Sequence, residues 1–359
     1  MEFRAGVEEL IKGKIFMSTK KRALIFGATG QDGSYLSELL LQKDYEVYGV
    51  SRQVSVSNLG RVGTSLQNPS YQIVTADITD GNSVSRLIKK LRPNEVYNLA
   101  AQSSVTISFD EPSHTFDVTA KGCLNILEAI RTESPDSRFF LASSSETYGG
   151  NYSVKDCYIN ENSEHIETRY QNEWTSFNPR SPYAVAKLAA FNLTRIYRDS
   201  YNLFTCSGIL HNHESIRRGE QFVTRKITRY IGDLLNSDKP IPKLKLGNLS
   251  VSRDWGHAKD TVIAMYLMLN TSKPRDYVVA TGATHSLKEF LTEAFSYIYR
   301  DWRDYVEVDP QLFRVNEVPY CQGDFSLIEK DLGWKPTITF KQLVREMVNA
   351  DSNLEKRVL

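Results

Sequence analysis

The chain has 359 residues, and its 44 Lys and Arg against 43 Asp and Glu leave a formal net charge of +1. This balance excludes a protein whose main partner is a nucleic-acid backbone, because such domains carry a visible basic excess. A hydrophobic content of 41% with 11% aromatic residues excludes a disordered chain, and no stretch approaches the roughly 18 apolar residues of a membrane span.

The cysteines and the first residues point to a reducing compartment. The four cysteines stand far apart, which suits neither a disulfide framework nor a zinc site, at Cys123, Cys157, Cys206 and Cys321. Residues 1–19 contain no apolar segment of signal-peptide length, and Met17 resembles an alternative start, so we predict a dispensable extension ahead of the fold. We expect a cytoplasmic protein that binds no metal.

The first informative segment joins two predicted strands through a glycine-rich turn. Residues 22–26 form an apolar run typical of a buried parallel strand, residues 34–41 have helical apolar spacing, and residues 45–50 return to a strand. The glycines between them allow a tight turn, a close approach to a pyrophosphate and close helix–strand packing. We therefore predict a dinucleotide site at Gly27, Thr29, Gly30, Gln31, Asp32 and Gly33.

The end of the second strand distinguishes the two nicotinamide dinucleotides. An NAD site usually places Asp or Glu there to accept the ribose hydroxyls, and residues 51–55 contain no carboxylate. Arg52, with Ser55 nearby, is suited to pair with a 2′-phosphate, so NADP is favoured over NAD. Asp77 and Ile78 follow the next predicted strand and are placed to contact the adenine ring.

Strands and helices then alternate along the chain. Apolar runs at 71–76, 95–100 and 138–142 predict strands, and residues 84–91 and 115–131 predict helices between them. Strands separated by helices of this length form a parallel, doubly wound α/β sheet. The ligand crevice of such a sheet lies at the carboxyl ends of its strands, where the motifs described next all fall.

A serine-rich strand end and a later helix supply the candidate catalytic groups. Ser144 and Glu146 follow the strand that ends at Ala142, while Tyr183 and Lys187, four residues apart, share one face of a helix. An ammonium group beside a phenol is expected to lower the pKa of the phenol, and Ser144 is positioned to hydrogen-bond the same substrate oxygen. Together these groups predict a base that removes a hydroxyl proton while hydride leaves the same carbon for a nicotinamide.

Several longer runs carry a family resemblance. They are GATGQDGSYL at 27–36, VYNLAAQS at 96–103, PRSPYAVAK at 179–187, NHESIRRGEQFVTRKITR at 212–229, GNLSVSRDWGHAKD at 247–260 and LGWKP at 332–336. In this order they resemble the extended short-chain dehydrogenase/reductases, and within them the GDP-mannose 4,6-dehydratase family. The resemblance implies a mainly NADP-binding Rossmann domain at 20–210 and a smaller, mainly nucleotide-sugar-binding α/β domain at 211–359, with 250–285 returning to the first.

The resemblance also implies the reaction, which is the removal of water from GDP-mannose or a close GDP-manno sugar. Carbon 4 is oxidised transiently, water is lost across carbons 5 and 6, and the hydride returns to carbon 6. Glu146 favours this lyase, because a carboxylate can take the carbon-5 proton and help to expel the carbon-6 hydroxyl, whereas related epimerases usually carry a small or hydroxyl residue there. The alternative is a GDP-sugar 4-dehydrogenase, reductase or epimerase, for example on a manno-heptose. A regulator that only senses dinucleotide would have lost Tyr183 or Lys187, and both are present.

The family further implies which residues contact each ligand. The cofactor is expected to contact Leu99, Ala100, Ala101, Ser103, Tyr183, Lys187, His213 and Arg218. The GDP-sugar is expected to contact Ser104, Ser145, Asn212, Glu214, Val223, Lys226, Gly247, Arg253, Arg314 and Glu317. Subunits of the family pair through helices that correspond to 115–131 and 184–198, and loop 52–62 offers a further contact, so we expect a homodimer or homotetramer.

The chain departs from the family pattern in three places. The segment between Gly149 and Pro179 is longer, and because it follows Glu146 it is placed to cover the sugar. Gln53 stands where the family has a second arginine, which weakens the argument for NADP. His211 replaces a phenylalanine near the nicotinamide.

Overall fold

The computed structural model describes residues 20–52, 56–159, 165–314 and 316–352. The predicted extension at 1–19 lies outside these described residues, as do Gln53 and Ser55. No helix in the described part of the chain combines the length and the apolar character needed to cross a membrane.

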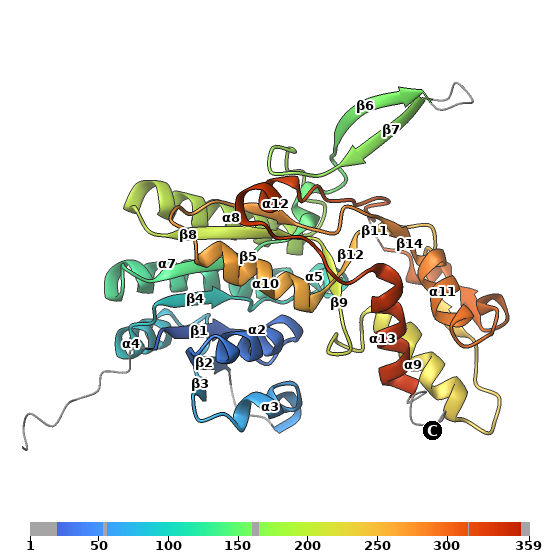
Figure 1. Cartoon of the computed structure of the whole chain (residues 1–359), viewed down its shortest axis with the longest axis horizontal. Coiled ribbons are helices and arrows are strands. Elements are labelled where there is room, and N and C mark those ends of the chain that lie inside the picture. The colour runs from blue at the N-terminus through green and yellow to red at the C-terminus, as the bar shows by residue number, and fades with distance from the viewer. Residues whose placement is uncertain (1–19, 53–55, 160–164, 315, 353–359) are drawn as a thin grey trace, which may run out of the picture.

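A seven-stranded parallel sheet forms the centre of the molecule (Figure 1). Its spatial order is β13-β8-β5-β4-β1-β2-β3, so the chain reverses its direction of winding between β1 and β4. A ligand crevice opens at such a reversal, outside the carboxyl ends of the strands. The strands are β1 (Arg22–Phe26), β2 (Glu46–Ser51), β3 (Tyr71–Thr75), β4 (Glu95–Asn98), β5 (Arg138–Ala142), β8 (Thr205–Leu210) and β13 (Tyr277–Val279).

Helices cover both faces of this sheet, which confirms the predicted doubly wound α/β fold. Leu36 and Leu40 on α2 pack with Met265 and Met268 on α10 against one face. The other face is covered by apolar side chains of α4, α7 and α8. The helices are α2 (Gln31–Gln42) and α10 (Ala258–Leu269) on the first face, with α12 (Ser326–Leu332) joining them, and α4 (Gly81–Leu91), α7 (Gly122–Glu133) and α8 (Pro182–Tyr201) on the second.

A separate apolar cluster holds the C-terminal part together. Phe290 and Phe295 are fully buried in it together with Leu343 and Met347. Its helices are α9 (Val223–Asn236), α11 (Leu287–Ser296) and α13 (Phe340–Ser352), beside the two-stranded sheet of β10 (Leu244–Leu246) and β15 (Val306–Val308). Two further pairs complete it, β9 (Asn212–Glu214) with β12 (Trp255–His257) and β11 (Ser252–Arg253) with β14 (His285–Ser286).

Shorter elements connect these layers. A 3-10 helix η1 (Val56–Val62) leads into α3 (Gly63–Leu66), and α5 (Val105–Asp110) follows β4; the remaining 3-10 helices are η3 (Ser145–Tyr148), η4 (Trp302–Asp304) and η5 (Pro310–Leu312). The single helix predicted at 115–131 is instead three segments: α6 (Pro112–Phe116), a π-helical turn η2 (Asp117–Lys121) and α7. Apolar spacing does not reveal a π-helical turn, because the turn is a single short segment within a longer helix.

The long segment after Gly149 contains an antiparallel hairpin, β6 (Ser153–Ile159) with β7 (His165–Tyr170). Figure 1 shows these strands projecting beyond the rest of the chain. The base of the segment does pack on the body, because Gln171 donates its backbone N–H to Gln322 and accepts from Asp324. The base of the segment is therefore anchored to residues 322–324.

Candidate active site

The turn between β1 and α2 is a cradle that side chains would fill. Gly27 has a φ of 83°, and a Cβ there would lie 2.9 Å from the backbone nitrogen of Ala100. A Cβ on Gly33 would lie 2.3 Å from the carbonyl oxygen of Gly27. Helix α2 begins at Gln31, and its N-cap residue Gly30 has no side chain to cap it, so the first N–H groups of the helix remain open to an anion. The turn fits the pyrophosphate of a dinucleotide.

The other residues predicted to hold the cofactor line the same edge of the sheet. Leu99, Ala100, Ala101 and Ser103 follow β4, and the Leu99 N–H donates to the Phe26 carbonyl at 3.0 Å. After β3, the side chain of Asp77 accepts two hydrogen bonds from Thr79, which lower the pKa of Asp77. Ile78 is buried beside Gly122. Arg52 is exposed at the end of β2.

Tyr183 and Lys187 lie on α8, one turn apart and both buried, as their spacing predicted. The Lys187 ammonium donates to the carbonyl of Ala142 at 2.7 Å and lies 5.8 Å from the centre of the Tyr183 ring. Burial raises the pKa of Tyr183 to about 12, although the Ser144 hydroxyl acts to lower this pKa. Burial lowers the pKa of Lys187 to about 8. The pKa of the phenol is therefore raised and not lowered as expected, because desolvation by burial is its largest influence.

Ser144, Ser145 and Glu146 form the turn that ends β5. The Ser144 hydroxyl accepts from the Glu146 N–H at 3.2 Å and is close enough to Tyr183 to lower the pKa of the phenol. Ser144 and Ser145 are buried and Glu146 is half-buried. The Glu146 carboxylate is close enough to raise the pKa of Tyr183. The structure thus brings the phenol, the hydroxyl and the carboxylate to one point at the carboxyl end of the sheet.

Asp32, in the first turn of α2, forms an ion pair with His213 on β9. His213 Nε2 lies 2.9 Å from Asp32 Oδ2, and His213 Nδ1 lies 2.7 Å from the carbonyl oxygen of His211. Burial disfavours both charges, but the pair outweighs it, so the pKa of His213 is raised and the pKa of Asp32 is lowered. Both ring nitrogens of His213 face acceptors, an arrangement that favours its imidazolium form beside the glycine turn.

The residues predicted to hold the GDP-sugar are spread over the C-terminal elements. Two of them, Glu214 and Arg253, have charged groups that already contact other groups of the protein. The Glu214 carboxylate accepts from the Thr224 hydroxyl at 2.8 Å and pairs with Arg218 at 3.1 Å. Buried Arg253 donates to the Val318 carbonyl at 2.7 Å. Ser104 caps α5, accepting from the Ile107 N–H at 3.3 Å. The others are Asn212 on β9, Val223 and exposed Lys226 on α9, Gly247 after β10, and Arg314 and Glu317 beyond η5.

Comparison with known proteins decides the family. The sequence pattern of the GDP-mannose 4,6 dehydratase family matches residues 24–347. This chain belongs to the GDP-mannose 4,6-dehydratase family. Its similar relatives include GDP-mannose 4,6 dehydratase 2 of Arabidopsis thaliana, 47% identical over 94% of this chain and 88% of the relative. The GDP-mannose 4,6 dehydratase of Drosophila melanogaster is 44% identical over 95% of this chain and 88% of the relative. That of Vibrio cholerae is 42% identical over 92% of this chain and 94% of the relative.

Solved structures of lower identity share the fold of this family member. A dTDP-glucose 4,6-dehydratase of Streptomyces venezuelae with NAD and TYD bound superposes with a TM-score of 0.78, at 21% identity over 94% of this chain and 98% of that one. RMD of Pseudomonas aeruginosa, complexed with NADPH, superposes with a TM-score of 0.72, at 21% identity over 93% of this chain and 100% of that chain. The fold is accordingly the Rossmann type of these dehydratases and epimerases.

Two features of this dehydratase-family site were missed in the sequence. Asp254 is fully buried and accepts from Thr281, Gly282 and Gly323, so it ties three loops together behind the crevice. Its place between Arg253 and Trp255, inside one of the runs that carry the family resemblance, is the sequence signal that indicates it. Within the described residues no three His, Cys, Asp or Glu side chains gather as a metal site.

A second missed cluster lies beneath Ser145. The Cys321 thiol donates to Gln171 at 3.0 Å and lies 3.5 Å from His211 Nδ1. Burial lowers the pKa of His211 to about 3, so this imidazole is neutral. Residues 110 or more positions apart meet here, which no local pattern signals.

Proposed function

We propose that this chain is a hydro-lyase that converts GDP-mannose to its 4-keto-6-deoxy derivative. The observation that carries the proposal is the convergence of Tyr183, Ser144 and Glu146 at the end of β5. The carboxylate distinguishes dehydration from epimerisation, and relatives that are 40–47% identical are named GDP-mannose 4,6-dehydratases. The 4-dehydrogenase, reductase or epimerase on the same scaffold is not favoured by these relatives.

Each group has a defined task in the proposed reaction. Tyr183 takes the proton of the carbon-4 hydroxyl, and Ser144 hydrogen-bonds the same oxygen and holds the phenol. Lys187 supplies positive charge below its pKa of about 8. Glu146 removes the carbon-5 proton, which the carbon-4 ketone has made acidic, and then protonates the leaving carbon-6 hydroxyl.

A nicotinamide dinucleotide fits the glycine turn, and when bound it stores the hydride from carbon 4 and supplies it to carbon 6. NADP is proposed over NAD, because Arg52 is exposed at the end of β2 and residues 51–55 contain no carboxylate to accept the ribose hydroxyls. The proposed contacts are those given above, with Asp32 and His213 fixing the start of α2. We also propose a cytoplasmic homodimer or homotetramer, in which exposed apolar residues of α5, α6 and α8 such as Phe109, Phe116 and Ile196 would be covered.

The activity is tested by incubating the purified chain with GDP-mannose and analysing the products by mass spectrometry. We expect a nucleotide sugar lighter by one water, with no net accumulation of NADPH. A product that retains its oxygen would contradict dehydration. Glu146→Gln is expected to lower the rate of water loss by about 100-fold or more while still allowing carbon-4 oxidation. Unchanged turnover in this variant would remove Glu146 from the mechanism.

A further inference from the structure

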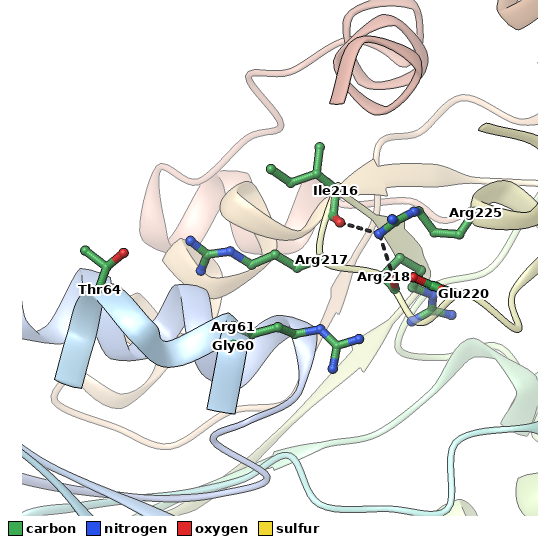
Figure 2. Close-up of a pocket in the computed structure, with 8 residues that line it drawn as sticks. All are labelled: Gly60, Arg61, Thr64, Ile216, Arg217, Arg218, Glu220 and Arg225. Carbon is green, nitrogen blue, oxygen red and sulfur yellow. Dashed lines mark hydrogen bonds between the residues drawn. The ribbon is translucent and has the colours of Figure 1, made fainter. Parts of the chain in front are cut away.

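Two separate features border the predicted ligand sites. The pocket drawn in Figure 2 lies beside the glycine turn, since Arg61 in its wall donates to the Thr29 carbonyl at 3.4 Å. The other feature is the arm, which we define as residues 316–323; it carries Glu317 and runs beside β11. Asp254, which directly follows β11, fastens this arm.

The arm pairs with β11 as a parallel strand does. The Ser252 N–H donates to the Pro319 carbonyl at 2.9 Å, and the Cys321 N–H donates to the Ser252 carbonyl at 3.2 Å. In a regular parallel ladder the next bond would join the Gly323 N–H to the Asp254 carbonyl. Instead the Gly323 N–H donates to the side chain of Asp254, 3.1 Å from Oδ2. The carboxylate therefore ends the ladder.

The same carboxylate binds the loop that follows β13. Thr281 donates its backbone N–H and its hydroxyl to Oδ1 at 2.8 and 2.7 Å, and the Gly282 N–H donates to Oδ2 at 3.0 Å. Asp254 is fully buried, and burial raises its pKa to about 6 although these donors act to lower it, so the group is charged at neutral pH. A buried charge holds its donors in one geometry, because losing a donor leaves the charge partly unsatisfied.

This arrangement links two residues that are predicted to contact the nucleotide. Arg253 directly precedes Asp254, is buried, and donates from Nη1 to the carbonyl of Val318 at 2.7 Å, next to Glu317 on the arm. Among the described residues no carboxylate pairs with Arg253, since the carboxylate of Asp254 is engaged by other donors. The guanidinium charge therefore remains available to an anionic ligand.

We propose that Asp254 is a positioning residue for the GDP part of the substrate, because it holds the arm that carries Glu317 in register with Arg253. The inference rests on the proposed function, since it takes the bound nucleotide to be GDP. Asp254 is fully buried and acts through the arm. Its loss should therefore weaken nucleotide binding far more than it slows the chemical step.

Asp254→Asn is the test variant. Its amide can still accept at Oδ1 from Thr281, but its NH₂ group stands where Oδ2 accepts from the N–H groups of Gly282 and Gly323. Donors then face donors, so these two contacts are lost. Thr281→Val removes one hydroxyl donor to the carboxylate; it is the milder second variant and serves if Asp254→Asn fails to fold.

Asp260→Asn is the matched control. Asp260 is also buried, and its Oδ2 accepts from the N–H groups of Thr337 and Ile338, both at 2.9 Å, while its Oδ1 accepts from the Thr337 hydroxyl at 2.6 Å. The same substitution therefore breaks the same kinds of contact, but between α10 and residues 337–338, where no nucleotide contact is predicted.

GDP is titrated into each full-length chain by isothermal titration calorimetry with NADP⁺ present, and kcat and KM for GDP-mannose are measured on the same preparations. Asp254→Asn is expected to weaken GDP binding and to raise KM by about tenfold or more, and Thr281→Val by about threefold, with kcat changed less than either. If both variants bind GDP as Asp260→Asn does, or if kcat falls while KM is unchanged, the proposal is wrong.

The positioning role and the proposed function can fail separately. A wild-type chain that binds GDP but does not dehydrate GDP-mannose would contradict the proposed function, and the GDP affinities of the variants would still decide the role of Asp254. A wild-type chain that binds no GDP would contradict both.

Discussion

Asp32 and His213 form an ion pair of 2.9 Å between residues 181 positions apart in the chain. The pair joins the first turn of α2 to β9. It is reinforced by Gln31, whose amide donates to Asp32 at 3.0 Å and to the His213 carbonyl at 3.1 Å. The position of the loop that follows β9 relative to the glycine turn therefore depends on two opposite charges.

This pair predicts a pH-dependent stability. The pKa of His213 is raised, so its contribution is complete below the ordinary histidine pKa and is lost as the pH rises through the folded-state value. The pKa of Asp32 is lowered, so its contribution is lost only in acid, as the pH falls through the folded-state value. We expect Asp32→Asn to cost about 2 kcal/mol near pH 6 and less near pH 9. Urea unfolding at both pH values measures this, and an equal cost at the two values would contradict it.

The buried Tyr183 and Lys187 predict the pH profile of turnover. The phenolate fraction of Tyr183 rises with pH towards its pKa of about 12, whereas the charge of Lys187 is lost as the pH passes about 8. We expect kcat/KM to rise with pH and to level or fall above about 8. Lys187→Arg keeps its charge and should move the alkaline limb to higher pH, at a rate reduced about tenfold. Lys89→Arg, at an exposed site on α4, is the control, and an unmoved limb in Lys187→Arg would refute the assignment.

The exposed Arg52 predicts cofactor preference. If its guanidinium pairs with a 2′-phosphate, Arg52→Ala should weaken the binding of NADPH by about tenfold and leave the binding of NADH unchanged, because only NADPH carries that group. Fluorescence titration of each reduced dinucleotide measures the two affinities. Unaltered NADPH affinity in Arg52→Ala would show that the argument from residues 51–55 is mistaken.

The turn after Glu146 predicts a strong glycine requirement. Gly149 has a φ of 57°, and a Cβ there would lie 1.6 Å from the carbonyl oxygen of Asn178, at the point where the hairpin segment returns to the body. Gly149→Ala is expected to lower the free energy of unfolding by about 3 kcal/mol. Gly63→Ala, with no atom within 4 Å of the added Cβ, is the matched control and should be neutral or stabilising. Equal midpoints of urea unfolding for the two variants would contradict this.

The sheet and the outline of the site were predictable because they depend on local patterns. Residues 22–26 and 138–142 are strands with the predicted bounds, and the glycine run at 27–33 forms the turn that its spacing required. Tyr183 and Lys187 share a helix face because the helical repeat dictates it. These features follow from neighbours in sequence, whose geometry is set by short-range sterics and hydrogen bonding.

The chemical state of the site was decided by the tertiary structure. The raised pKa of Tyr183 reflects desolvation, and the depth of burial is a property of packed elements, not of a motif. Asp32 and His213 are 181 positions apart and meet only in the folded chain. The sequence alone determined which groups are present and the sheet that carries them. Their charge states and partners depend on water exclusion and on contacts between distant segments, which exist only in the folded chain.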